Sequence, residues 1–272
     1  DEAITTWQWV QVPIRVREAI DKRLDGYIEE AIRSYEGVPT ATNLSKAKGG
    51  PLGYSYGPLM DRLKKNRALA EALEAKGISF VEKCDRKAFD EAIVEKQLTN
   101  VTEKVRKAKD KRLDGYILEA IQAYEGVPTA TNLSKARKGP LEYGVKIIGD
   151  RLRENPSLQK VLEAKGALYV ETCDRKTFDE AVTTGKWGTV PEKIKQIIDK
   201  RLDGYIEEAI RSYEGVPTAR NIRKVNGGSL EYGNVLIEER FRRNPFLAEA
   251  LVIRWASFVE TCGRKTFDEA IA

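Results

Sequence analysis

Apolar residues recur every three or four positions through the first part of the chain, which is the pattern of one buried helix face. This spacing predicts an amphipathic helix over residues 13–35, ending near the Gly-Val-Pro segment at 37–39. Pro13 suits the first helical position, where its missing N–H removes no hydrogen bond. The apolar positions that define the face are Ile20, Leu24, Tyr27, Ile28, Ala31, Ile32 and Tyr35.

A short helix is predicted to follow the first one. Thr40 is a suitable N-cap for a helix over residues 41–47, because a threonine hydroxyl can accept a hydrogen bond from a free N–H of the first turn. The Gly-Gly-Pro sequence at 49–51 then breaks this helix and starts a turn.

A third helix is predicted over residues 56–65. Leu59 and Leu63 lie four residues apart and therefore on one face. Because a glycine precedes Pro58, an alternative start at Pro58 would leave Tyr56 as a loop residue.

An Asn-Pro pair predicts the start of a fourth helix, because Asn caps a helix and Pro favours its first position. The pair occurs at Asn155 and Asn244, whereas Asn66 keeps the cap without the proline. We expect Gly166 to end this helix. Residues 78–83 alternate well enough for a short strand, and they are also compatible with continued helix.

Asp85 can cap a last helix that passes through Phe89 and Ile93. The pattern as a whole predicts a mainly α fold, with a short β element in each unit as the open alternative at residues 78–83.

The predicted elements recur because the sequence repeats with a period of 89 residues. The motif Asp-Lys-Arg-Leu-Asp-Gly-Tyr at 21–27 returns at 110–116 and 199–205. About 89 residues can form a small core of their own, so we predict three tandem helical domains. The short helix, the glycine-containing turn and the third helix of each domain resemble a helix-turn-helix, so we expect helix-turn-helix-like domains. Residues 1–12 are expected to be the tail of a preceding repeat, and the three repeats to span 13–97, 98–186 and 187–272.

The connectors between repeats are expected to be ordered. Trp9 and Trp187, with Leu98 at the equivalent place, indicate packed junctions, and no Ser/Gly-rich or Pro-rich linker is present. We therefore expect adjacent repeats to pack along the chain.

Composition argues against several classes of function. The chain has no histidine and one cysteine per repeat (Cys84, Cys173 and Cys262), so the clustered ligands of a zinc site are missing. No acidic pair lies in a recognisable catalytic frame, and we expect no enzymatic activity and no cofactor. With 33% charged residues and no apolar run of about 20, we expect a cytoplasmic protein without membrane contact.

The repeats are most different in one short window. Residues 55–60, 144–149 and 233–238 share little beyond an apolar residue at Leu59, Ile148 and Ile237. Milder differences occur in the short helix, where Thr42 and Thr131 correspond to Arg220. These differences reflect either neutral drift on a solvated face or contact surfaces that differ from repeat to repeat.

Basic charge gathers in the same part of each repeat. Residues 40–67, 129–156 and 218–245 each carry a basic excess, although the whole chain is only +5. A focused basic patch can neutralise phosphates even when the overall charge is low.

The stretch Gly-Val-Pro-Thr-Ala-Arg-Asn-Ile-Arg-Lys-Val-Asn-Gly-Gly-Ser at 215–229 is similar to the DNA-binding region of KfrA-type plasmid regulators of bacteria. The resemblance covers about 30 residues of each repeat and does not include the long coiled-coil tail of that family. It implies that the helix at 56–65 and its equivalents enter the major groove, with the variable window facing the bases.

The nucleic-acid contacts that follow from this resemblance and from the charge pattern are distributed over all three repeats. In repeat 1 they are Thr42, Lys46, Lys48, Tyr56, Arg62, Lys64 and Lys65. In repeats 2 and 3 they are Arg137, Lys138, Lys146, Arg151, Arg153, Arg220, Arg223, Lys224, Asn234, Arg240, Arg242 and Arg243. The arginines and lysines of the third helix are expected to contact phosphates, which strengthens binding without specifying sequence.

Two functions are compatible with these observations. The first is a modular, sequence-specific protein that binds double-stranded DNA and is associated with the nucleoid, with RNA as a further possible ligand. The alternative is a tandem-repeat scaffold for protein partners, in which the tyrosines and tryptophans pack one repeat on the next. Steep salt dependence of duplex binding would distinguish the first from the second.

Overall fold

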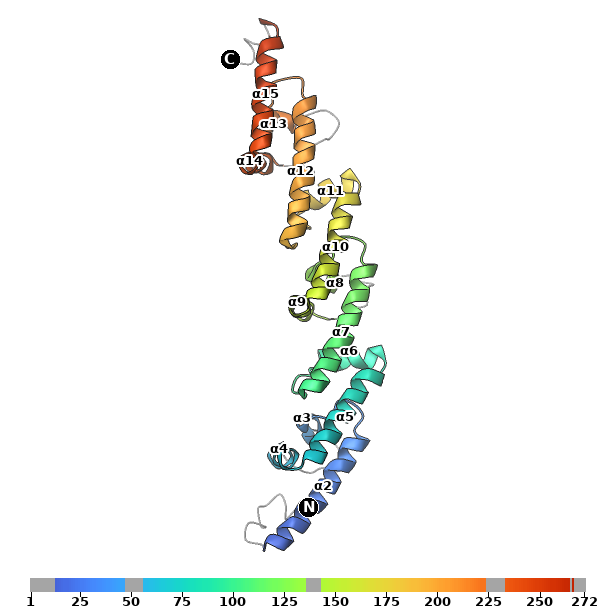
Figure 1. Cartoon of the computed structure of the whole chain (residues 1–272). Helices are drawn as coiled ribbons and strands as arrows, with labels where there is room; N and C mark the ends of the chain where they lie inside the picture. Colours follow the sequence, from blue (N-terminus) through green and yellow to red (C-terminus); the bar gives the residue numbers. More distant parts are fainter. Residues whose placement is uncertain (1–12, 47–55, 136–142, 224–232, 265, 267–272) are drawn as a thin grey trace. The chain divides into compact units, whose positions relative to one another are not determined.

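A computed structural model describes residues 13–46, 56–135, 143–223 and 233–264 together with residue 266. Every regular element within these ranges is an α-helix, and they contain no strand (Figure 1). None of the helices in the described ranges is long and apolar enough to cross a lipid bilayer.

The described residues of the first two repeats contain five helices each. In repeat 1 they are α2 (Ile14–Ser34), α3 (Ala41–Lys46), α4 (Tyr56–Lys65), α5 (Arg67–Lys83) and α6 (Arg86–Val94). In repeat 2 they are α7 (Glu103–Ala123), α8 (Ala130–Lys135), α9 (Val145–Glu154), α10 (Pro156–Thr172) and α11 (Arg175–Thr183). The described part of repeat 3 contains α12 (Glu192–Ser212), α13 (Ala219–Ile222), α14 (Asn234–Arg243) and α15 (Pro245–Thr261).

Contacts between Cα atoms divide the chain into two compact units. The first unit consists of residues 1–120 and 138–155, and the second of residues 121–137 and 156–272. The border between the units therefore falls inside repeat 2, and the sequence period and the compact units do not coincide.

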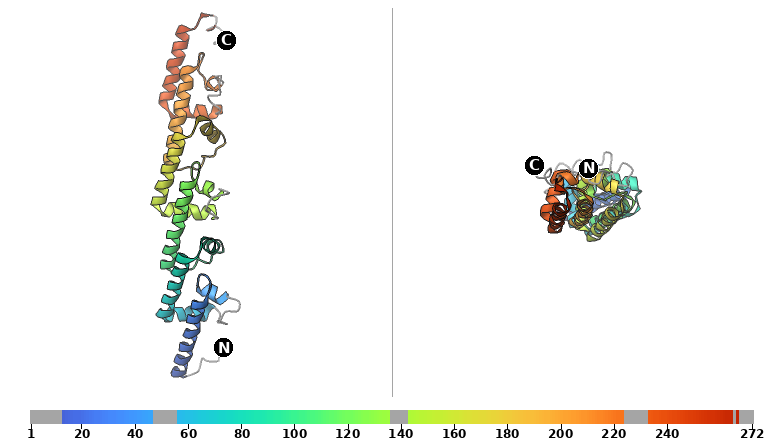
Figure 2. Two further views of the ribbon diagram at one scale, coloured as in Figure 1. Left: turned by 90° about the vertical axis from the view of Figure 1, so that its right-hand side faces the viewer. Right: turned by 90° about the horizontal axis from the view of Figure 1, so that it is seen from above.

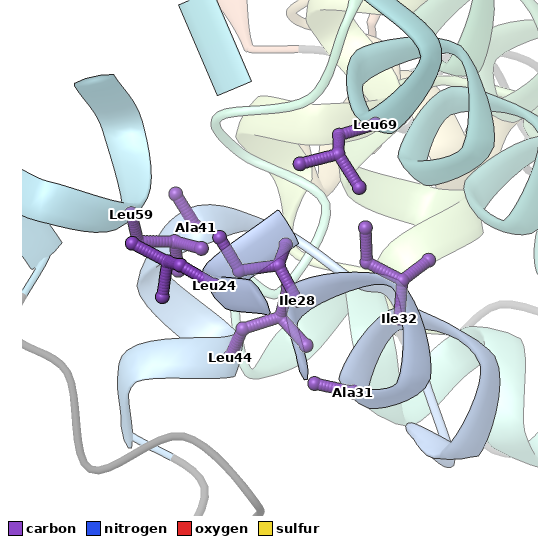
Figure 3. Packing of buried hydrophobic residues seen from close by; sticks show 8 residues of the cluster. All are labelled: Leu24, Ile28, Ala31, Ile32, Ala41, Leu44, Leu59 and Leu69. Atoms are coloured by element: carbon purple, nitrogen blue, oxygen red, sulfur yellow. The ribbon is translucent and has the colours of Figure 1, made fainter. Parts of the chain in front are cut away.

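The core of the first unit forms where four helices of repeat 1 meet (Figure 3). One face of α2 supplies half of it, as the three- and four-residue spacing predicted, and α3, α4 and α5 each add one or two side chains. Burying each such aliphatic side chain contributes roughly 1.5–3 kcal/mol. The buried residues are Leu24, Ile28, Ala31, Ile32, Ala41, Leu44, Leu59 and Leu69.

The second unit repeats this core with the residues of repeat 3. In both ribbon views α12 and α15 lie side by side (Figures 1 and 2), and they are in contact. Ala219, the equivalent of Ala41, is half-buried, and the other seven equivalent positions are again buried: Leu202, Ile206, Ala209, Ile210, Ile222, Ile237 and Leu247.

The predicted helix caps are confirmed by their hydrogen bonds. Thr40 Oγ1 accepts from the N–H of Asn43 at 3.0 Å. Asn66 Oδ1 accepts from the N–H of Ala68 at 3.1 Å, and Asp85 Oδ1 accepts from the third residue of α6 at 2.8 Å. Pro13 is the residue before α2 and not its first helical residue.

The prediction that Gly166 ends its helix is wrong, because α10 continues through it to Thr172. A Cβ on Gly166 would lie only 2.4 Å from Cδ1 of Ile194, so the glycine permits close packing of α12. Gly77 has the same role in α5, where a Cβ would lie 2.9 Å from Cγ2 of Val105. Residues 78–83 accordingly continue α5, so the helical alternative holds for this segment.

Candidate interaction surface

A half-buried cluster of three polar residues fixes α4 and α5 on α2 in the first unit. Arg62 Nε and Nη2 donate to the two carboxylate oxygens of Asp25 at 2.8 and 2.6 Å. Asn66 Nδ2 donates to Asp25 Oδ2 at 2.7 Å, and Arg62 Nη1 lies 2.7 Å from Asp21 Oδ2. We call Asp25, Arg62 and Asn66 the Asp–Arg–Asn cluster.

The other two repeats contain the same cluster. In repeat 2, Arg151 Nε and Nη2 donate to Asp114 at 2.8 Å each. In repeat 3, Arg240 Nε and Nη2 donate to Asp203 at 2.7 and 2.8 Å. The asparagine that caps the following helix donates to the same carboxylate in both, at 2.8 Å.

Electrostatics favours the ionised state of the cluster. Burial alone would raise the pKa of Asp25, but hydrogen bonds from Arg62 and Asn66 outweigh it and lower this pKa below its ordinary value. Donating these hydrogen bonds to Asp25 in turn raises the pKa of Arg62. Bidentate pairing of this kind fixes the orientation of both groups as well as their charge.

This cluster corrects the role that sequence reasoning gave to three arginines. Arg62, Arg151 and Arg240 were expected to contact phosphates, yet their side chains are only 14%, 13% and 9% exposed. Each guanidinium group is paired with carboxylates of its own repeat. A phosphate could reach these guanidinium groups only if the helix packing opened, so we remove them from the candidate surface.

The short helix is attached by one asparagine in every repeat. The side-chain amide of Asn43 donates to Val38 O at 2.8 Å, and Asn132 and Asn221 make the same bond at 2.8 and 2.9 Å. Their backbone N–H groups meanwhile bond the capping threonine. The short helix is therefore bonded in the same way, in every repeat, to the connecting segment that precedes it.

A buried tyrosine also holds the start of α9. Tyr143 is 2% exposed, and its hydroxyl donates to Oδ1 of Asp90 from α6. Burial, together with this carboxylate, raises the pKa of Tyr143 far above its ordinary value. Ile148 of α9 is fully buried one turn later.

Most of the other predicted contact residues lie at the surface. Thr42 is half-buried, and Tyr56 is 51% exposed. The exposed basic residues are Lys46, Lys64, Lys65, Lys146, Arg153, Arg220, Arg223, Arg242 and Arg243. Asn234 is the first residue of α14, and Lys48, Arg137, Lys138 and Lys224 lie outside the described residues.

Apart from the cluster arginines, the charged side chains of α9 and α14 balance. On α9, Lys146 and Arg153 are offset by Asp150 and Glu154, and Arg153 pairs with Asp150. On α14, Glu238 and Glu239 offset the exposed Arg242 and Arg243, and Arg243 pairs with Glu239 one turn earlier. Only α4 keeps a basic excess, at Lys64 and Lys65.

Exposed apolar side chains lie in the first turn of all three helices. They are Tyr56 on α4, Val145 on α9 and Val235 on α14, which are 51%, 44% and 74% exposed. These residues fall in the window that differs between repeats. Because the buried anchor of each helix comes two or three residues later, the first turn is held in place while its side chains face solvent.

Sequence reasoning missed the arginine that joins one repeat to the next. Arg112 Nη2 donates to Cys84 O at 2.7 Å, and its guanidinium lies over the ring of Phe89 at 4.7 Å. Arg201 repeats the arrangement in the second unit with Cys173 O at 2.6 Å. Burial raises the pKa of both cysteine thiols. The sequence does contain a signal for this arginine, because it belongs to the motif that recurs unchanged at 21–27, 110–116 and 199–205.

Within the described ranges, no group of three or more His, Cys, Asp or Glu side chains could hold a metal ion. Comparison of the chain with protein-family models, with curated proteins and with solved structures gave no match.

Proposed function

We propose that this chain is a tandem-repeat scaffold for protein partners, in which each repeat presents the first turn of its third helix. The observation that carries the proposal is the contrast within α4, α9 and α14. Their inner sides are held by the same half-buried cluster in every repeat, whereas the exposed first turns differ. A fixed frame with variable side chains is suited to separate contacts at each repeat.

The character of these first turns supports a protein partner. Tyr56, Val145 and Val235 are apolar and exposed, and exposed apolar groups are common at protein–protein contacts. A nucleic-acid surface would instead be expected to keep unpaired basic residues around such a turn. The exposed charges of α9 and α14 balance, and those helices therefore offer little attraction to a phosphate backbone.

Sequence-specific binding of DNA remains the second candidate, and one observation favours it. Lys64 and Lys65 are exposed together at the end of α4, and Arg220 and Arg223 are exposed on or just after α13. If the third helix entered the major groove, these residues could contact phosphates beside it.

The two candidates make opposite predictions for variants of the full chain. We would select binders from a displayed random-peptide library, and in parallel from a random duplex pool at low salt. For the scaffold, selected peptides should lose at least about tenfold in affinity when Val145→Asp or Tyr56→Asp is introduced, because a charge disrupts an apolar contact. Lys87→Ala, on an exposed side chain of α6, should leave their affinity unchanged.

Two outcomes would overturn the scaffold proposal. Peptide binding that is indifferent to both first turns would contradict it. So would duplex binding that falls steeply between low and moderate salt and is lost in a Lys64→Ala, Lys65→Ala double variant.

A further inference from the structure

The three equivalent helices α5, α10 and α15 have a face that is covered in the first two repeats. In the first unit α7 lies against this face at Gly77, and in the second unit α12 lies against it at Gly166. Val81 and Val170, on the next turn of that face, are both 0% exposed. A helix from the following repeat therefore covers the face in both cases.

The same face of α15 is apolar and exposed. Trp255 stands at the position that is glycine in α5 and α10, and Val252 stands where both of those helices carry glutamate. Val252 is 66% exposed, Trp255 43% and Val259 42%. Val259 is the equivalent of the two fully buried valines, so the change in exposure lies on one matched face.

These residues form a regular seam. Ala248, Val252, Trp255 and Val259 follow one another at spacings of four, three and four residues, which is the a/d spacing of helices that pair with another helix. We call these four residues the α15 seam. Phe246 and Ile253 are also exposed, but the helical period of 3.6 places them on a different side of α15, beyond Glu249 and Ala256.

The tryptophan makes this face unsuitable for another repeat of the same kind. At the equivalent glycines a single methyl group would already come within 2.4–2.9 Å of the incoming Ile194 or Val105. An indole at this position would require the whole incoming helix to move outward. A first helix like α7 or α12, in this chain or in another copy, cannot pack there as closely as it does within the two units.

We propose that the α15 seam pairs, antiparallel and about a two-fold axis, with the α15 seam of a second copy of this chain. The proposal rests on the sizes of the seam side chains, which are complementary when two copies of the seam pair antiparallel. Antiparallel pairing centred between residues 253 and 254 places Val252 against Trp255 of the second copy and Ala248 against its Val259. Each large side chain then meets a smaller one, and both pairs occur twice because the contact is isologous.

The test is the mass of the full chain in solution, measured by sedimentation or light scattering at about 1–100 µM. The wild-type chain should have twice the monomer mass at the upper concentrations. The double variant Val252→Glu, Trp255→Gly gives α15 the residues that α10 carries at these positions, and it should have the monomer mass throughout.

Two further variants keep the result interpretable. Phe246→Ser removes a still more exposed apolar residue from another side of α15, and it should leave the dimer intact. Unchanged helix content in the double variant, by circular dichroism, would exclude unfolding as the cause of dissociation. A wild-type chain that stays monomeric up to 100 µM, or a dimer that survives the double substitution, would overturn the proposal.

Discussion

At the residue scale, the most informative arginines are those whose side chains pair with carboxylates inside their own repeat and are little exposed. Arg62, Arg151 and Arg240 each connect two helices through a carboxylate 37 positions earlier in the chain. Buried charges of this kind are costly when one partner is removed, because the remaining charge is left without compensation. The Asp–Arg–Asn cluster should therefore be sensitive to substitution on either side.

We expect Arg240→Met to lower the free energy of unfolding by about 2–3 kcal/mol, since the half-buried Asp203 would lose its main partner. Arg240→Lys should restore only part of the loss, because an ammonium group cannot make the bidentate contact. Arg242→Met, two residues away and exposed, is the control and should change stability by no more than about 0.5 kcal/mol. Chemical denaturation measures all three, and equal effects at 240 and 242 would contradict a structural role.

The lowered pKa of Asp25 predicts how the effect of its removal depends on pH. The pKa of this carboxyl is lower in the folded chain than in the unfolded chain, where it is near 3.9. The ionised carboxylate therefore stabilises the fold at pH values above the unfolded pKa. This contribution is lost as the pH falls through the folded pKa. The penalty of Asp25→Asn should thus be greatest at neutral pH and decrease below about pH 4. Denaturant titrations at pH 7, 4 and 3 test this, with Asp61→Asn on the exposed side of α4 as the control. A penalty independent of pH would show that the charge of Asp25 is not what matters.

At the element scale, helix caps and hydrophobic periodicity made most helices predictable. Glycine was less informative, because it has different structural roles at different positions. Gly166 resembles a helix terminator in sequence, but it lies inside α10 because α12 needs the space. Gly204 also lies inside a helix, and apart from its chain neighbours and the backbone of its own helix no atom comes within 4 Å of the position its Cβ would occupy. The same residue type therefore costs helix stability at one site and permits a junction at the other.

Leucine at these two glycines should have opposite effects. Gly204→Leu should raise the free energy of unfolding by roughly 0.5–1 kcal/mol, because it removes a glycine from a helix without a clash. Gly166→Leu should lower it by about 1–3 kcal/mol through overpacking against Ile194. Thermal or chemical unfolding distinguishes the two signs. A stabilising effect at both positions would mean that the junction tolerates bulk.

Local signals explain which parts of the structure could be predicted. The caps at Thr40, Asn66 and Asp85 and the buried face of α2 depend on neighbours within four residues, and all were recognised from sequence. The pairing of Asp25 with Arg62 joins distant positions, and an arginine on a helix does not by itself reveal its partner. Comparing the copies would have helped, since all three cluster positions are unchanged in every repeat.

At the scale of the whole molecule, the sequence period and the compact units have different borders. Arg112 belongs to repeat 2 in sequence, yet it completes the end of repeat 1 within the first unit. Arg201 belongs to repeat 3 and completes the end of repeat 2 within the second unit. A fragment cut at the sequence border of repeat 1 or repeat 2 would lose the arginine that donates to the carbonyl groups at the end of α5 or α10.

The depth of the Asp–Arg–Asn cluster has a practical consequence for engineering. Its atoms hold α9 from the inner side, and the exposed first turn at Val145 and Lys146 takes no part in it. Side chains in that turn can therefore be randomised while the fold is retained. A library built on this one turn would keep the same backbone presentation in every member, which is the property wanted in a source of artificial binding proteins.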